Sequence, residues 1–145
     1  MDVEFYKSLL RKRKGKVLLS EGAGRKVYKI DKYVIKRAKN KRGIAECHNE
    51  SYIYKNCNSD IKNLLCPVLY FEEGVIIMPY IEVLDSKYFN RYIFKFDKYN
   101  YLKDYLVSKF NLDDHDLEYH FNWGMYKNNI YLLDYGHNYL GKFLD

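Results

Sequence analysis

The sequence predicts an α+β protein, in which a five-stranded antiparallel sheet with one helix is followed by two further helices and a small β-hairpin. Three observations lead to this prediction. Short segments in which apolar and polar residues alternate fill the first half of the chain, and turns that contain glycine or aspartate separate them. One longer segment among them has apolar residues at helical spacing. After Pro79 the spacing of Tyr, Phe, Leu and Val becomes helical, until a last pair of short strands.

The first half of the chain supplies the sheet. It opens with a short amphipathic helix or a frayed arm, two alternatives that the sequence leaves open. The predicted elements are this arm at residues 3–12, strands at 16–20, 26–30, 33–37, 68–72 and 75–78, and a helix at 45–56 that is entered through a polar, glycine-containing loop. Turns at 21–24, 31–32 and 73–74 join neighbouring strands, so the pairing is expected to be antiparallel.

The second half is expected to be mainly helical. Its predicted elements are helices at residues 86–96 and 99–110, an acidic connector at 111–118, and strands at 124–126 and 130–133 around a turn at 127–129. With 145 residues the chain is expected to form one domain, with residues 14–80 as the sheet-containing lobe and 81–145 as a reduced helical lobe.

Charge is unevenly distributed along the chain. The formal net charge is +6, but the first 43 residues hold 15 of the 25 Lys and Arg residues and only 4 of the 19 acidic ones. A basic segment of this kind suits nucleic acid, a membrane surface or nucleotide phosphates, or is simply a solvated face. No apolar run is long enough for a signal peptide or a membrane span. Three cysteines without metal-binding spacing favour a reducing, cytoplasmic location.

The turn between the first two strands contains Gly22 and Gly24, in the stretch LSEGAGRKVY. Such a turn lets backbone N–H groups approach phosphates with no side chain in between, although a hairpin also needs glycine for its own geometry. In the third predicted strand, Lys36 follows the β-branched residues Val34 and Ile35. A lysine on the inner face of a sheet needs a carboxylate or a bound anion, and the following helix offers Glu50, with Glu46 one turn earlier as the rival.

Asn122 and Asp134 flank the last hairpin, in HFNWGMYKNNIYLLDYG. Amide and carboxylate oxygens are ligands that Mg²⁺ accepts, usually together with phosphates and water. The alternative to a metal site is that residues 134–136 form an ordinary turn. None of the four histidines has a paired spacing that suits zinc.

In this order, the glycine turn, strand lysine, helix glutamate, Asn and Asp-Tyr-Gly resemble the protein-kinase-like superfamily. The sequence is most similar to the small kinase-like proteins of bacteriophages and related mobile elements, and the similarity covers nearly the whole chain. The resemblance implies a kinase-like N-lobe and a minimal helical C-lobe that stops soon after the Asp-Tyr-Gly hairpin.

The resemblance also implies roles for individual residues and the cofactors ATP and Mg²⁺. Lys36 would contact the phosphates and pair with Glu50, while Asn122 and Asp134 would hold Mg²⁺. Residues 77–81 would form the hinge at the adenine. The expected adenine contacts are Met78 behind the base, the backbone of Pro79 and Ile81 at its edge, and Val27 and Leu132 on its two faces.

The position of the catalytic base departs from the kinase pattern. Kinases carry an Asp five residues before the metal-binding Asn, and here that position is Leu117. Asp116 and Glu118 flank it and are the two candidate bases. These observations leave two possible functions, one as an enzyme and one as a binding protein. The first is a minimal kinase that phosphorylates a protein or itself. The second is a kinase-like binding protein that engages a partner protein, and a basic nucleic-acid binder is a distant third.

Overall fold

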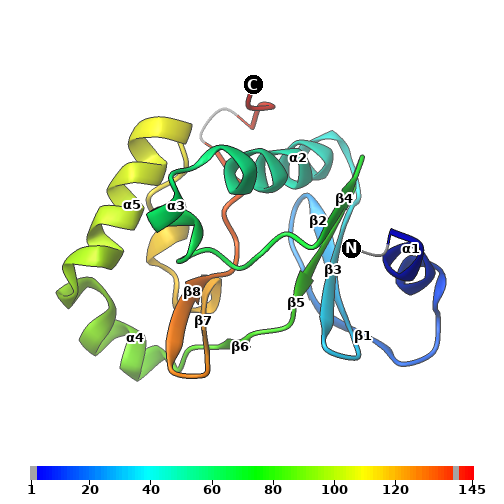
Figure 1. Cartoon of the computed structure of the whole chain (residues 1–145), viewed down its shortest axis with the longest axis horizontal. Helices are drawn as coiled ribbons and strands as arrows, with labels where there is room; N and C mark the ends of the chain where they lie inside the picture. Colours follow the sequence, from blue (N-terminus) through cyan, green and yellow to red (C-terminus); the bar gives the residue numbers. More distant parts are fainter. Residues whose placement is uncertain (1–2, 139–140) are drawn as a thin grey trace.

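The computed structural model describes residues 3–138 and 141–145, and its architecture is α+β, as the sequence predicts (Figure 1). A five-stranded antiparallel sheet has the strand order β1-β2-β3-β5-β4. Its strands are β1 Lys16–Glu21, β2 Arg25–Ile30, β3 Tyr33–Ala38, β4 Tyr70–Glu72 and β5 Val75–Pro79. Each predicted strand is present, with ends that differ by two residues or fewer.

Tight turns explain why these segments pair with their neighbours along the chain. Asp31 adopts a left-handed conformation, with φ of 52°, between β2 and β3. Gly74 does the same between β4 and β5, with φ of 80°. Glycine accepts this conformation without steric cost, and Asp tolerates it better than most residues.

The two faces of the sheet are covered by different helices, as Figure 1 shows for α1 and α2. Ile35 packs with the buried Leu9 of α1, Val3–Arg11, and with Ile77. The next residue along β3, Lys36, points to the opposite face and meets Glu50 of α2, Lys41–Asn56. This is the alternation expected of a strand. The first segment is therefore a packed helix and not a frayed arm.

Helix α2 begins four residues before the predicted start at residue 45. Asn40 caps it, with its side chain accepting a hydrogen bond from the Gly43 N–H at 3.1 Å. The glycine that suggested a loop lies inside the helix because the Gly24 carbonyl packs directly against Gly43, where a Cβ would not fit. A tertiary contact therefore overrides the local preference of glycine.

The second half contains the predicted helices and hairpin, with several short additions. Its elements are β6 Glu82–Val83, α4 Ser86–Tyr92, α5 Asp97–Phe110, β7 Trp123–Tyr126 and β8 Asn129–Leu132, with 3₁₀ turns at Ile93–Lys95, Asp116–Glu118 and His120–Asn122. A further short helix, α3 Ser59–Lys62, lies in the first half, between α2 and β4. Strands β6, β7 and β8 form a second sheet. The helix predicted at 86–96 ends early, at Tyr92. Elements as short as α3 and β6 leave no periodic pattern to read.

The main hydrophobic core joins the two halves. It contains Trp123, whose indole N–H donates to the Leu117 carbonyl at 2.9 Å, together with residues from α2, α5 and the hairpin. After β8 the chain returns to α2, where the Asn49 side chain donates to the Gly136 carbonyl at 3.2 Å.

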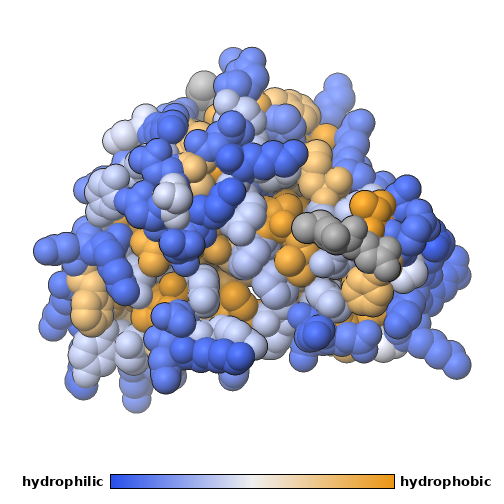
Figure 2. Space-filling view, in the orientation of Figure 1, coloured by the Kyte–Doolittle hydropathy of each residue, from blue (hydrophilic) through white to orange (hydrophobic). Residues whose placement is uncertain are grey.

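Hydrophilic residues cover most of the outline of the molecule in Figure 2, and hydrophobic ones show toward its middle. Among the described residues, no helix is long and apolar enough to cross a membrane.

Candidate active site

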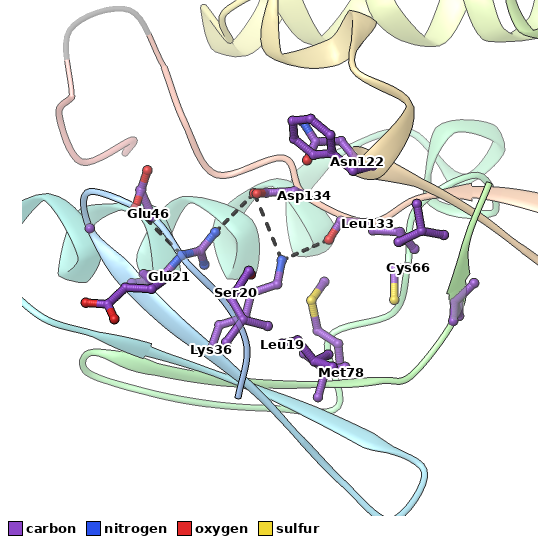
Figure 3. A pocket seen from close by; sticks show the side chains of 18 of the residues that line it. Leu19, Ser20, Glu21, Lys36, Glu46, Cys66, Met78, Asn122, Leu133 and Asp134 are labelled. Carbon is purple, nitrogen blue, oxygen red and sulfur yellow. Dashed lines mark hydrogen bonds and ion pairs between the residues drawn. The ribbon is translucent and has the colours of Figure 1, made fainter. Parts of the chain in front are cut away.

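A cleft of about 630 Å³ lies between the five-stranded sheet and the hairpin half of the chain. It brings together parts of the sequence that are more than 100 residues apart. Nine of the expected site residues line it. The lining contains Gly22, Gly24, Val27, Lys36, Met78, Pro79, Ile81, Asn122 and Asp134. Figure 3 shows Lys36 and Met78 on the sheet side, and Asn122 and Asp134 on the other.

An ion pair lies at the inner end of this cleft. The Lys36 ammonium is 3.0 Å from one carboxylate oxygen of Glu50 and 3.2 Å from the other. Lys36 is 6% exposed and Glu50 is completely buried. The ammonium also donates to the Leu133 carbonyl at 2.8 Å, and Glu50 accepts the Tyr135 N–H at 2.9 Å (Figure 3 draws the Leu133 bond). The pair is thus well supplied with hydrogen bonds, which a buried ion pair requires.

Glu46, the rival partner of Lys36, has other contacts. It lies 3.7 Å from the Arg25 Nε and 3.7 Å from the Arg42 Nε, and one of its oxygens is 3.6 Å from His137 Nδ1. Burial raises the pKa of Glu46, but its contacts with His137, Arg25 and Arg42 outweigh burial and lower the pKa overall. Glu46 is therefore held as a carboxylate at the outer turn of α2.

Arg25 is a cleft residue that the sequence analysis did not identify. It is 5% exposed, and its guanidinium donates to Glu50 at 2.7 Å and to Asp134 at 3.1 Å. Burial works against the charge of Arg25, but Glu50 and Asp134 raise its pKa well above the usual value. A signal was present in the sequence: Arg25 and Val27 are two apart on one strand, and alternate residues of a strand share a face.

Asp134 faces the cleft from the segment after β8. Its carboxylate contacts Arg25 and lies 4.0 Å from the Lys36 ammonium, while its side chain stays 45% exposed (Figure 3). Burial of the carboxyl raises its pKa, but Lys36 and Arg25 lower it further, so the pKa lies below the ordinary value. Asp134 is therefore an anion that is open to the cleft on one side.

The amide of Asn122 has a defined orientation. Its nitrogen donates to the Asp116 carbonyl at 2.6 Å, and its backbone carbonyl accepts the Leu133 N–H at 2.7 Å. Because the nitrogen makes the bond to the protein, the amide oxygen is left as an acceptor. A carboxylate and an amide oxygen that line one cleft are a donor set that suits Mg²⁺. The residues present therefore fit this ion.

One expected adenine contact is wrong. Leu132 is completely buried in the main core, and it is Leu133 that lines the cleft. Leu132 is opposite Trp123 in the β7–β8 ladder, on the core side, so the next residue turns toward the cleft. The family resemblance placed this contact one residue too early, and a shift of one residue along an extended chain exchanges the two faces.

The two candidate bases lie outside the set of described residues that line the cleft. Leu117, between them, is buried and holds the 3₁₀ turn in the core. Glu118 instead pairs with Lys103 of α5 at 3.0 Å. Asp116 has a side chain that is 39% exposed and lies 3.9 Å from His137 Nε2. Burial raises the pKa of Asp116. Only the backbone carbonyl of Asp116 reaches the site, through Asn122.

His137 connects this turn to helix α2. Its Nε2 lies 3.8 Å from Asp113 and 3.9 Å from Asp116, and its Nδ1 faces Glu46. Ligand atoms of Asp113, Asp116 and His137 all lie within 4.8 Å of one another. The sequence analysis missed this cluster, because its members are up to 24 positions apart and follow no metal-binding spacing.

Comparison with solved structures identifies the fold. No protein-family model and no curated protein sequence matches the chain. The structure resembles that of the aminoglycoside phosphotransferase APH(2'')-IIa in its gentamicin complex, with a TM-score of 0.50 and 17% sequence identity over 94% of this chain and 70% of that chain. The ternary complex of that enzyme with streptomycin and ATP gives a TM-score of 0.51 and 18% identity over 94% and 71% of the two chains.

The chain therefore has a protein-kinase-like fold, of the kind found in phosphotransferases. This confirms the kinase-like fold that the sequence motifs predicted. The similarity to bacteriophage proteins stays a prediction from the sequence.

Proposed function

We propose that the protein binds ATP and Mg²⁺ in this cleft and transfers the terminal phosphoryl group to a protein, which includes the possibility of transfer to itself. The observation that carries the proposal is the buried Lys36–Glu50 pair in a cleft that Asn122 and Asp134 also line. The streptomycin–ATP complex of the structural neighbour supports ATP as the nucleotide.

Each part of the cleft would make a separate contribution. Val27 and Met78 supply apolar surface for a flat base, and the Pro79 carbonyl remains an acceptor for its edge, since proline lacks only the N–H. Lys36, oriented by Glu50, would contact the phosphates. Asn122 and Asp134 would hold Mg²⁺, which neutralises phosphate charge when it is bound.

Phosphoryl transfer also needs a group that removes the proton from the acceptor. Asp116 is the better base candidate, because Glu118 is paired with Lys103. The placement of both outside the cleft lining favours a second candidate function, a nucleotide-binding pseudokinase that acts by engaging a partner protein. The two functions share the nucleotide site and differ in whether phosphate is transferred.

The test combines binding with transfer. The wild type, Lys36→Ala and Asp134→Ala would be incubated with Mg²⁺ and ATP labelled at the γ-phosphate, and their thermal stability would be measured with and without ATP. Lys32→Ala is a matched control, since Lys32 is an exposed lysine in the turn between β2 and β3, outside the cleft lining.

Label on the wild type and on Lys32→Ala alone supports the kinase. Stabilisation by ATP without label supports the pseudokinase. If the wild type shows no stabilisation by ATP and no label, both functions are overturned.

A further inference from the structure

Arg25 contacts Asp134, the carboxylate that is expected to bind the metal ion. Its guanidinium donates to an oxygen of Asp134 at 3.1 Å, within the range of an N–H···O hydrogen bond. Arg25 approaches from β2, while Asp134 comes from the segment after β8, so this hydrogen bond connects the two sides of the cleft. Any cation that uses this oxygen must therefore share it with Arg25 or displace Arg25.

Charge at the inner end of the cleft is already balanced. The cations Arg25 and Lys36 face the anions Glu50 and Asp134 in a connected set of ion pairs. Glu46, which also lies 3.7 Å from Arg25, is balanced by Arg42. Glu50 is completely buried and Arg25 nearly so, which makes the pairs strong, because a low-dielectric environment screens them little. A site with balanced charge attracts a divalent cation less than one with a net negative charge.

Asp134 nevertheless remains accessible from the cleft, since its side chain is 45% exposed. The metal has a path to the carboxylate, and the obstacle is electrostatic, not steric. Arg25 has a second anchor in Glu50 at 2.7 Å, so it can release Asp134 without losing its only partner. This geometry suits a reversible exchange between Arg25 and a metal ion.

We propose that Arg25 competes with Mg²⁺ for Asp134 and thereby sets the Mg²⁺ concentration at which the nucleotide binds. This inference rests on the proposed nucleotide site. It makes Arg25 a positioning residue that regulates the metal requirement and does not contact the reacting atoms.

The test measures Mg²⁺ dependence of binding. Anisotropy of a fluorescent ADP analogue would be followed at fixed protein concentration while Mg²⁺ is raised from zero, for wild type, Arg25→Met and Arg25→Lys. Mg²⁺ also binds the nucleotide in solution, but equally for each variant, so the comparison of midpoints is unaffected. We expect the midpoint to fall about tenfold in Arg25→Met, since a hydrogen bond between charged groups is removed. Arg25→Lys should lie in between.

The direction of the change separates competition from structural damage, because a damaged site needs more Mg²⁺ and not less. Arg42→Met is the matched control: it removes the same charge from the cleft lining, but Arg42 pairs with Glu46 and not with Asp134. Its midpoint should stay close to that of the wild type. Fluorescence of the buried Trp123 verifies folding. If Arg25→Met fails to fold, Arg25→Lys decides the test.

Three results would overturn the inference alone: an unchanged or higher midpoint in the Arg25 variants that fold, an equal fall in Arg42→Met, or full affinity of the wild type without Mg²⁺. Failure of the wild type to bind the nucleotide at saturating Mg²⁺ would overturn the proposed function, and this inference with it.

Discussion

The ammonium of Lys36 and the carboxylate of Glu50 lie 3.0 Å apart, one on β3 and the other on α2, and the Glu50 side chain is completely buried. Glu50 serves two cations, because Arg25 contacts its other oxygen at 2.7 Å. The helix is therefore attached to the sheet through one carboxylate with two ionic partners. This arrangement makes Glu50 more important for stability than either of its partners.

Glu50→Gln should be strongly destabilising. The substitution keeps the size of the side chain but removes the buried anion that Lys36 and Arg25 share, and breaking a buried ion pair typically costs about 3–5 kcal/mol. Lys36→Met should cost less, since Glu50 keeps Arg25 and the Tyr135 N–H. Urea unfolding followed by Trp123 fluorescence measures both free energies. Equal losses in the two variants would contradict the shared role of Glu50.

Gly43→Ala should destabilise the protein even though alanine favours helices. A Cβ at Gly43 would overlap the Gly24 carbonyl and lie 2.9 Å from the Ala38 Cα, and backbone atoms cannot move aside cheaply. Overpacking of this kind costs about 1–3 kcal/mol, and the overlap here is with backbone on both sides, so we expect it to exceed the gain of about 1 kcal/mol in helix propensity.

Gly22→Ala is the control for the same glycine-rich region, because no atom lies within 4 Å of the added Cβ. Its unfolding midpoint in urea should match that of the wild type. A tolerated Gly43→Ala, or a damaging Gly22→Ala, would show that the packing of the turn against α2 has been misjudged.

Stability should decrease from pH 6 to pH 8.5 through His137. The Glu46 carboxylate, 3.6 Å from His137 Nδ1, raises the pKa of His137 above its ordinary value of 6.5, against the effect of burial, and Asp116 contributes while Arg42 opposes. Asp113 also faces the ring at 3.8 Å. A raised pKa means that the folded state holds the proton more tightly. The stabilisation is therefore complete below pH 6.5 and is lost as the pH rises through the folded-state pKa.

His137→Gln is the comparison for this effect. The difference in unfolding free energy between wild type and His137→Gln should shrink across this pH range in urea titrations. A difference that does not vary with pH would rule out His137 as the titrating group.

The cysteines should differ in reactivity. Cys66 lines the cleft, but burial raises the pKa of its thiol to about 12, so at pH 8 only about one thiol in 10,000 is ionised. Cys47 is buried as well, whereas Cys57 is partly exposed. Treatment of the native protein with an aromatic disulfide reagent, followed by peptide mass spectrometry, should therefore label Cys57 first. Rapid labelling of Cys66 would contradict its buried state.

The sequence by itself determined the strands, most of the helices and the candidate ligands. Alternation and turn residues reveal strands because successive side chains of a strand point to opposite faces of the sheet, and the segments that became β1, β2, β3, β4 and β5 were predicted in this way. Lys36, Glu50, Asn122 and Asp134 were identified because chemical type and order along the chain are local information. The short β6 and the early start of α2 were missed, since one has too few residues and the other depends on Gly24.

Only the tertiary structure decided how the charges are shared. The position of Arg25 on Glu50 and Asp134 and the exchange of Leu133 for Leu132 each depend on distances between segments far apart in the chain. Ion pairs form where side chains meet in space, and a few ångströms decide which carboxylate a buried cation contacts. The same reason explains why Glu118 binds Lys103 instead of facing the cleft.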